Sequence, residues 1–270
     1  MHVNIGDAEI HYEVVGTGEP LLLVAGLGGA ASYWQPNVEA LAARYQVVLH
    51  DHRGTGRSTR CEMPYSVELM AADLLKLMDA LDIRRAHLVG HSTGGAIGQV
   101  LAATQPSRIA SLVLYATWAT LDAQMARCLR LRRLVLQKAG PGEYHRATPL
   151  FLYPPDYICA NDEALEREVA TATGASPSAS ILEARLNGIM AFDGLPYLER
   201  IRCPSLVLVA DDDILTPPHS SELLARRIPG AQLARMPHGA HAMSRTEPDL
   251  FNETVLAFLE QHRMKQGAQP

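Results

Sequence analysis

Residues 90–94 read Gly-His-Ser-Thr-Gly, a Gly-x-Ser-x-Gly pattern in which the serine could act as a nucleophile. The apolar run Ala86–Val89 precedes the pattern and the small-residue stretch Gly95–Ala103 follows it, as expected for a turn between a strand and a helix. Glycines two residues either side of Ser92 remove the Cβ atoms that would collide in so tight a turn. The sequence therefore predicts a nucleophile elbow at Ser92, with the backbone N–H of Thr93 directed at the attacked carbonyl.

A serine hydroxyl needs a base within hydrogen-bond reach, and the base needs a carboxylate to orient it. Three aspartates, residues 211–213, follow the apolar run Leu206–Val209, and His238 and His241 follow the run Gln232–Met236. If both runs are parallel strands, these side chains share the edge of the sheet that carries Ser92. His241 lies deeper in its loop than His238, but the residues alone leave open which of the three aspartates is the acid and which of the two histidines is the base.

Two glycine-containing loops follow other apolar runs. The loop after Leu21–Ala25 reads Gly-Leu-Gly-Gly, and we expect the backbone N–H of Leu27 to be the second oxyanion donor and Gly28 to contact substrate. The loop from Asp51 to Ser58 lacks the Gly-Lys-Ser/Thr ending of a phosphate-binding loop. We interpret it as a structural loop held by Asp51 and Arg53.

The pattern along the chain predicts a mostly parallel, doubly wound α/β sheet that begins with an antiparallel hairpin. Short apolar runs alternate with helical patterns, which is typical of βαβ units. The hairpin strands are predicted at Val3–Ile5 and Glu9–Val15, on either side of a Gly-Asp turn. The further strands are predicted at Leu21–Ala25, Val47–His50, Ala86–Val89, Leu112–Tyr115, Leu206–Val209 and Gln232–Met236, with helices at Val67–Leu81 and Gly95–Thr104.

The stretch from residue 118 to 200 interrupts that alternation, because it contains helical patterns and no convincing strand. We expect helices at Ala123–Lys138, Asp162–Thr173 and Ser180–Met190. Residues 1–117 and 201–270 then form the α/β core, and residues 118–200 form a helical cap over the strand ends, where α/β proteins bind their ligands.

Composition indicates one globular domain with an insertion: 270 residues, 47% hydrophobic and 20% charged, with a formal net charge of −5. No basic stripe suggests nucleic acid, and no apolar run approaches the ~20 residues that span a bilayer. The four cysteines form no CxxC or metal-ligand spacing, so we expect reduced thiols, no metal and no cofactor. The start of the chain has no secretory pattern, which favours a cytoplasmic protein. The expected partner is a small molecule, and a homodimer stays open.

Taken together, these residues resemble the α/β-hydrolase family over essentially the whole chain, and within it the RutD-type aminoacrylate or carbamate hydrolases of pyrimidine degradation. The stretches that carry the second resemblance are 26–29, 32–34, 45–48, 51–56, 127–128, 150–154, 185–187, 200–204, 220–223, 236–237 and 239–242. The stretches in the cap are the more specific evidence for the RutD type, because the nucleophile elbow and the loop with the aspartates are common to the whole superfamily. The resemblance implies Asp213 as the acid, four residues before Pro217, and His241 as the base.

The resemblance also implies a small, carboxylated substrate with a scissile C–N bond. A buried carboxylate needs a cation or several N–H donors, and the cap offers Arg127, Arg132 and Arg185, with Trp118 and Phe151 as apolar walls. Aminoacrylate has no acyl leaving group, so the role of Ser92 stays open between covalent attack and positioning of water. Similarity to 3-oxoadipate enol-lactonases keeps an ester or lactone hydrolase as an alternative, and a non-catalytic receptor is a second alternative.

Overall fold

The computed structural model describes residues 1–264, whose centre is an eight-stranded sheet in the order β1-β2-β4-β3-β5-β6-β7-β8. β1 pairs antiparallel with β2 and β2 antiparallel with β4, and every later pairing is parallel. The predicted fold class is confirmed, with the antiparallel hairpin at its start. The strands are β1 His2–Asn4, β2 Glu9–Val15, β3 Pro20–Val24, β4 Gln46–His50, β5 Ala86–His91, β6 Ile109–Tyr115, β7 Ser205–Ala210 and β8 Gln232–Met236.

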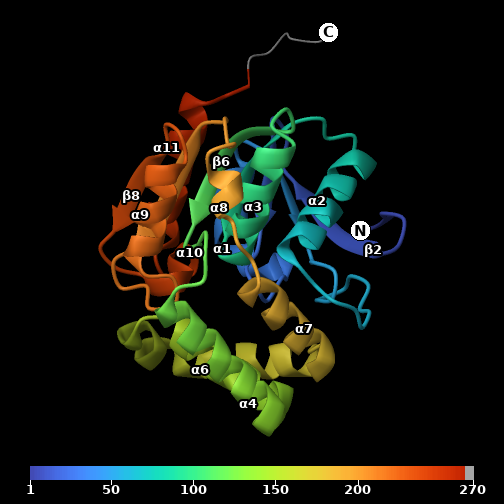
Figure 1. The fold of residues 1–270 in the computed structure, drawn as a ribbon, viewed down its shortest axis with the longest axis vertical. Helices are drawn as coiled ribbons and strands as arrows, with labels where there is room; N and C mark the ends of the chain where they lie inside the picture. The colour runs from blue at the N-terminus through green and yellow to red at the C-terminus, as the bar shows by residue number, and fades with distance from the viewer. Residues whose placement is uncertain (265–270) are drawn as a thin grey trace.

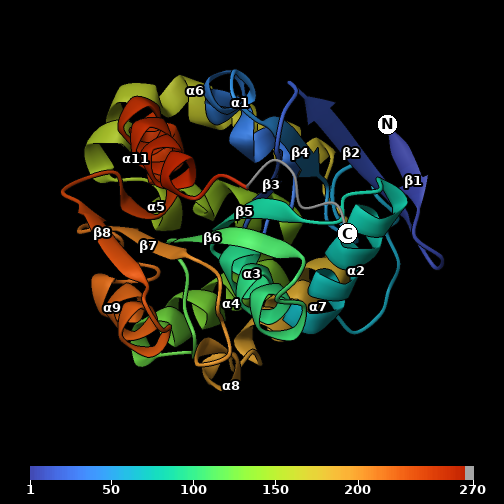
Figure 2. The same cartoon turned by 90° about the horizontal axis from the view of Figure 1, so that it is seen from above.

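Helices cover both faces of the sheet (Figure 2). Successive residues of β3 point to opposite faces: Leu21 and Leu23 belong to one buried cluster, and Leu22 and Val24 to the other. This is why the central strands are apolar at every position rather than at alternate ones. The first face is covered by α1 (Gln35–Ala42) and α11 (Pro248–Gln261), and the second by α2 (Val67–Ala80), α3 (Thr93–Thr104) and α9 (Pro218–Arg227).

Two neighbouring strands, β3 and β5, send the chain to opposite faces of the sheet. The chain leaves β3 through the short helix η1 (Ala31–Trp34) to α1, whereas it leaves β5 directly into α3. Open α/β sheets bind ligands at the carboxyl ends of strands whose connections diverge in this way.

The chain between β6 and β7 forms a helical layer beyond the strand ends (Figure 1). An isolated antiparallel bridge between Thr120 and Asp193 joins the two ends of this stretch. The last short helix, α8 (Leu195–Leu198), already packs against α3. The other helices of this layer, which we call the cap, are α4 (Ala123–Ala147), α5 (Pro149–Leu152), α6 (Pro155–Gly174) and α7 (Ala179–Met190).

Two cap helices are longer than the sequence predicts, and each departs from helical geometry near the predicted boundary. α4 continues beyond the expected end at Lys138, but Gly140 has a φ of 82° before Pro141. α6 starts at Pro155 rather than at Asp162, and Asn161 is the non-helical residue inside it. The sequence signals therefore mark a kink inside each of these helices rather than its end.

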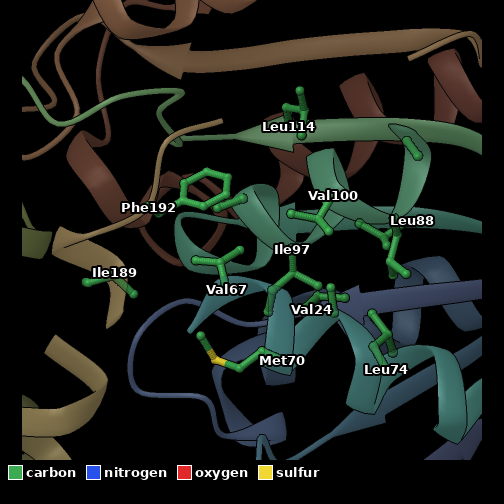
Figure 3. Close-up of a cluster of buried hydrophobic side chains, with 14 of the residues drawn as sticks. Val24, Val67, Met70, Leu74, Leu88, Ile97, Val100, Leu114, Ile189 and Phe192 are labelled. Atoms are coloured by element: carbon green, nitrogen blue, oxygen red, sulfur yellow. The ribbon is translucent and has the colours of Figure 1, made fainter. Parts of the chain in front are cut away.

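The core continues without interruption from the sheet into the cap. Figure 3 shows Ile189 of α7 and Phe192 beside Val67, Met70 and Ile97 of the core helices. One buried cluster contains all of these residues together with Leu129 and Leu136 of α4. The cap is thus anchored by burial of apolar surface. Every helix within residues 1–264 is too short or too polar to cross a membrane.

Candidate active site

Ser92 lies in a strained turn between β5 and α3. Its φ of 52° and ψ of −113° are unusual for a residue other than glycine. A Cβ at Gly90 would overlap the carbonyl of Gly94, and one at Gly94 would overlap the carbonyl of Val24. The Ser92 carbonyl accepts a hydrogen bond of 2.7 Å from Thr117 Oγ1. The elbow predicted from the glycine spacing is therefore present in the structure.

His241 and Asp213 are in direct contact. The imidazole Nδ1 of His241 lies 2.9 Å from Asp213 Oδ2, and both side chains are buried. Asp213 also accepts hydrogen bonds from the backbone N–H groups of Leu215 and Thr216 and from Thr216 Oγ1. The contact with Asp213 engages Nδ1 of the imidazole and leaves Nε2 as the ring nitrogen that does not face the carboxylate.

The competing acidic and basic residues have other partners. Asp211 pairs with Arg235 at 2.7 Å on the surface. Asp212 accepts hydrogen bonds from the backbone N–H groups at 239 and 240 and lies 2.8 Å from His238 Nδ1. His238 also lies 3.2 Å from Asp156 of the cap. Of the residues that sequence alone left open, the structure thus brings together Asp213 and His241.

A buried polar platform joins the histidine turn to the elbow. The carbonyl oxygen of His241, in the short helix η2 (Ala240–Ala242), accepts hydrogen bonds of 3.0 Å from His91 Nε2 and from Tyr115 Oη. The His91 ring stacks on Tyr33 at 4.5 Å, and burial holds the pKa of His91 well below its usual range. His91 is therefore neutral, and its ring is part of this buried platform. Tyr33 and Tyr115 have no local motif that would have marked them in the sequence.

The hydroxyl of Ser92 and the imidazole of His241 form no mutual hydrogen bond in the part of the chain that the structure describes. The ring of His91, the residue before Ser92 in the chain, lies 4.9 Å from the ring of His241. Contacts of this kind are often long without substrate and shorten when it binds.

The loop after β3 lies against the elbow. A Cβ at Gly26 would lie 3.3 Å from Ser92 Cβ and 3.0 Å from His91 Nδ1. Leu27 is half-buried, and its carbonyl accepts a hydrogen bond of 2.9 Å from Arg185 Nη2. Gly28 is exposed, with open space where a Cβ would be. Thr93 is buried at the first position of α3. Thr93 therefore follows Ser92 directly in the chain, and the residue before Leu27 lies beside Ser92 in space, while the oxyanion role of both N–H groups stays a prediction.

The three cap arginines occupy different environments. Arg127 is exposed, so the expectation that it contacts substrate is corrected: its position in the helix directs it outward. Arg185 is fully buried and donates hydrogen bonds to the carbonyls of Arg53 and Leu27. Burial lowers its pKa to about 10. Arg132 is also buried, on the side of α4 that faces the core.

The two predicted apolar walls differ in depth. Trp118 is fully buried and packs edge-to-face on Phe192 at 6.2 Å, whereas Phe151 is half-buried at the margin of the same cluster. The loop from 51 to 58 has the structural role expected of it. Asp51 accepts hydrogen bonds from the backbone N–H groups of Ala31 and Arg57, and Arg53 binds Asp73 and Asp7.

Comparison with known proteins places this architecture in a family. The family model for the alpha/beta hydrolase fold matches residues 19–248, most of the chain. The chain is an α/β-hydrolase. A protein of Azorhizobium caulinodans named "Putative carbamate hydrolase RutD" is 46% identical to this α/β-hydrolase over 253 residues, which cover 94% of this chain and 96% of that protein. One of the same name from Caulobacter sp. strain K31 is 42% identical over 93% of this chain and 94% of that protein.

Solved structures of enzymes share the same fold. The enol-lactonase of Burkholderia xenovorans LB400 superposes on this α/β-hydrolase with a TM-score of 0.89 at 27% identity, covering 96% of this chain and 100% of that one. A thermophilic esterase from Thermogutta terrifontis superposes with a TM-score of 0.84 at 28% identity, covering 95% of each chain. These two relatives and these two neighbours carry hydrolase names, and this chain is a hydrolase.

Proposed function

We propose that this α/β-hydrolase cleaves a small substrate with a scissile C–N bond, of the carbamate or amide type, through Ser92, His241 and Asp213. The observation that carries this proposal is the buried 2.9 Å contact between His241 Nδ1 and Asp213 Oδ2. The His241 ring also lies 4.9 Å from the ring of His91, the residue before the strained Ser92. Such a contact leaves Nε2 of the imidazole free to accept the serine proton.

The reaction then follows from the chemistry of these groups. Ser92 Oγ attacks the carbonyl carbon while its proton passes to His241 Nε2. The N–H groups of Leu27 and Thr93 stabilise the oxyanion, and each such donor typically contributes ~10²–10³ in rate. The imidazolium returns its proton to the departing nitrogen, and a water molecule, deprotonated by the same imidazole, releases the acyl group from Ser92.

The relatives named for carbamate hydrolysis support this substrate class, since the similarity extends across the cap as well as the core. We further propose that the enzyme acts in the cytoplasm, that the reaction is a step of pyrimidine degradation, and that its partner is a small-molecule substrate. For an aminoacrylate, whose imine form lacks an acyl leaving group, water would add to the C=N carbon and Ser92 would position that water.

Ester or lactone hydrolysis is the second candidate function. It is favoured by the likeness to an enol-lactonase and an esterase, and it would use the same three residues. A receptor on this fold would bind such molecules without turnover.

A panel of aminoacrylate, carbamate, enol-lactone and short p-nitrophenyl esters, assayed with purified protein, tests the substrate class. Ser92→Ala should abolish hydrolysis of acyl substrates and reduce aminoacrylate turnover less, because water can be the nucleophile there. Retention of most esterase activity by Ser92→Ala would disprove the acyl-enzyme mechanism. Negligible turnover of the whole panel would favour the receptor.

A further inference from the structure

Arg132 is a charged residue on the buried face of a cap helix. Met125, Cys128, Leu129 and Leu136 are the other buried side chains of this face of α4, at the three- and four-residue spacing of one helical side. Arg132 is only 6% exposed. An arginine at such a position needs an anion or a set of acceptors, because transfer of a charge from water is costly.

The partners of Arg132 are all neutral. Nη2 donates hydrogen bonds to Tyr144 Oη at 3.0 Å and to Thr148 Oγ1 at 3.2 Å. The guanidinium also lies over the rings of Tyr144 and Phe151, 4.9 and 5.6 Å from their centroids. Within residues 1–264, no carboxylate pairs with Arg132, and its Nε is buried without any hydrogen-bond partner. Aromatic faces offset only part of the cost of burying a cation.

Another buried arginine shows how the same chain neutralises such a charge. Arg53 is 2% exposed and forms hydrogen bonds with both carboxylate oxygens of Asp73 and of Asp7. Arg53 is thus neutralised within the protein, whereas Arg132 and Arg185 have no carboxylate partner among the described residues. Arg185 donates to two backbone carbonyls, but Arg132 donates only to side-chain hydroxyls.

The surroundings of Arg132 connect it to the candidate active site. Phe151, beneath its guanidinium, belongs to α5, and α5 packs against the turn η2 that carries His241. Arg132 therefore lies in the part of the cap that meets the turn with His241.

We propose that Arg132 is the anion-binding residue of this hydrolase and that its unpaired guanidinium nitrogens bind a carboxylate of the substrate. Tyr144 and Thr148 fix the guanidinium, and Phe151 supports it from below. The inference rests on the proposed function and narrows it, since it requires a substrate that carries a carboxylate at one end and the scissile bond at the other. Arg132 then determines specificity for anionic substrates by lowering their KM.

Two esters of equal shape test the proposal. Monomethyl fumarate has a carboxylate where methyl crotonate has a methyl group, and the trans double bond keeps that carboxylate away from the ester. We expect a lower KM for monomethyl fumarate in the unaltered enzyme. Arg132→Met should raise that KM by ~10–100-fold, the effect of a lost charged hydrogen bond, and should change the KM for methyl crotonate by less than about twofold. Arg132→Lys should lie between the two.

The control is Arg127→Met, an exposed arginine on the same helix, which should leave both KM values unchanged. The same comparison can be made as binding to the Ser92→Ala protein by calorimetry, so slow turnover does not prevent the test. Equal effects of Arg132→Met on both esters, or no preference of the unaltered enzyme for the anion, would overturn the proposal. Neither outcome depends on whether Ser92→Ala abolishes acyl hydrolysis. The Ser92→Ala assay therefore tests the proposed function, and the comparison of the two esters tests the role of Arg132.

Discussion

Arg185 of the cap donates a hydrogen bond of 2.9 Å to the carbonyl oxygen of Leu27, the residue whose N–H we propose as an oxyanion donor. Its other terminal nitrogen donates at 2.8 Å to the carbonyl of Arg53. A single buried side chain thus connects helix α7 with two loops of the core. The geometry of the oxyanion loop therefore depends on the cap.

Replacing Arg185 should affect catalysis more than binding. Arg185→Met removes both hydrogen bonds. We expect kcat to fall by ~10-fold or more with a smaller change in KM, because a misplaced N–H donor stabilises the transition state less. Arg185→Lys should recover part of kcat. Thermal unfolding must be measured beside the kinetics. A folded Arg185→Met protein with unchanged kcat would show that the loop holds its shape without this contact.

The two histidines after β8 should respond differently to substitution. His241→Asn removes the only ring in contact with Asp213 within the described chain and should abolish hydrolysis. His238→Asn alters a half-exposed pair with Asp212 and Asp156 and should leave most activity. Steady-state assays of both variants on one ester are sufficient. The reverse result would reassign the base to His238.

The three consecutive aspartates provide matched variants. Asp213→Asn should lower kcat on the order of 10⁴-fold, as loss of a triad acid does, because the amide no longer favours the required imidazole tautomer. Asp211→Asn loses a surface pair with Arg235 and should have little effect. Asp212→Asn should be far milder than Asp213→Asn. Comparable losses at all three positions would indicate a general disturbance of the loop.

Stability should fall with acid because of buried histidines. Burial lowers the pKa of His50 to about 4, and it holds the pKa of His52 well below its usual range. The unfolded chain binds these protons near pH 6.5, so the free energy of unfolding is greatest above that pH. It should decrease between about pH 6.5 and 4, by on the order of 3 kcal/mol for His50.

Urea unfolding at a series of pH values measures this effect. His50→Gln should flatten the decrease, while His2→Gln, a change at an exposed histidine, should not. A His50→Gln protein with the same pH dependence as the unaltered protein would assign the acid sensitivity to other groups.

The amino-acid sequence by itself determined the alternating strands and helices and the elbow at Ser92. These depend on short-range rules: apolar runs make buried strands, and Gly90 and Gly94 permit a turn that side chains would block. It also located the loops after β7 and β8, because parallel strands end at one edge of the sheet. It did not decide from the residues alone between Asp213 and its neighbours.

Only the tertiary structure decided which distant groups meet. It brought Asp213 to His241, and it joined Tyr33 and Tyr115 into the platform that holds the histidine turn. It also separated the cap arginines into exposed Arg127 and buried Arg132 and Arg185. The physical reason is the same in each case: burial and hydrogen-bond partners depend on how the cap packs on the core, and contacts between residues far apart in the chain leave no periodicity in the sequence.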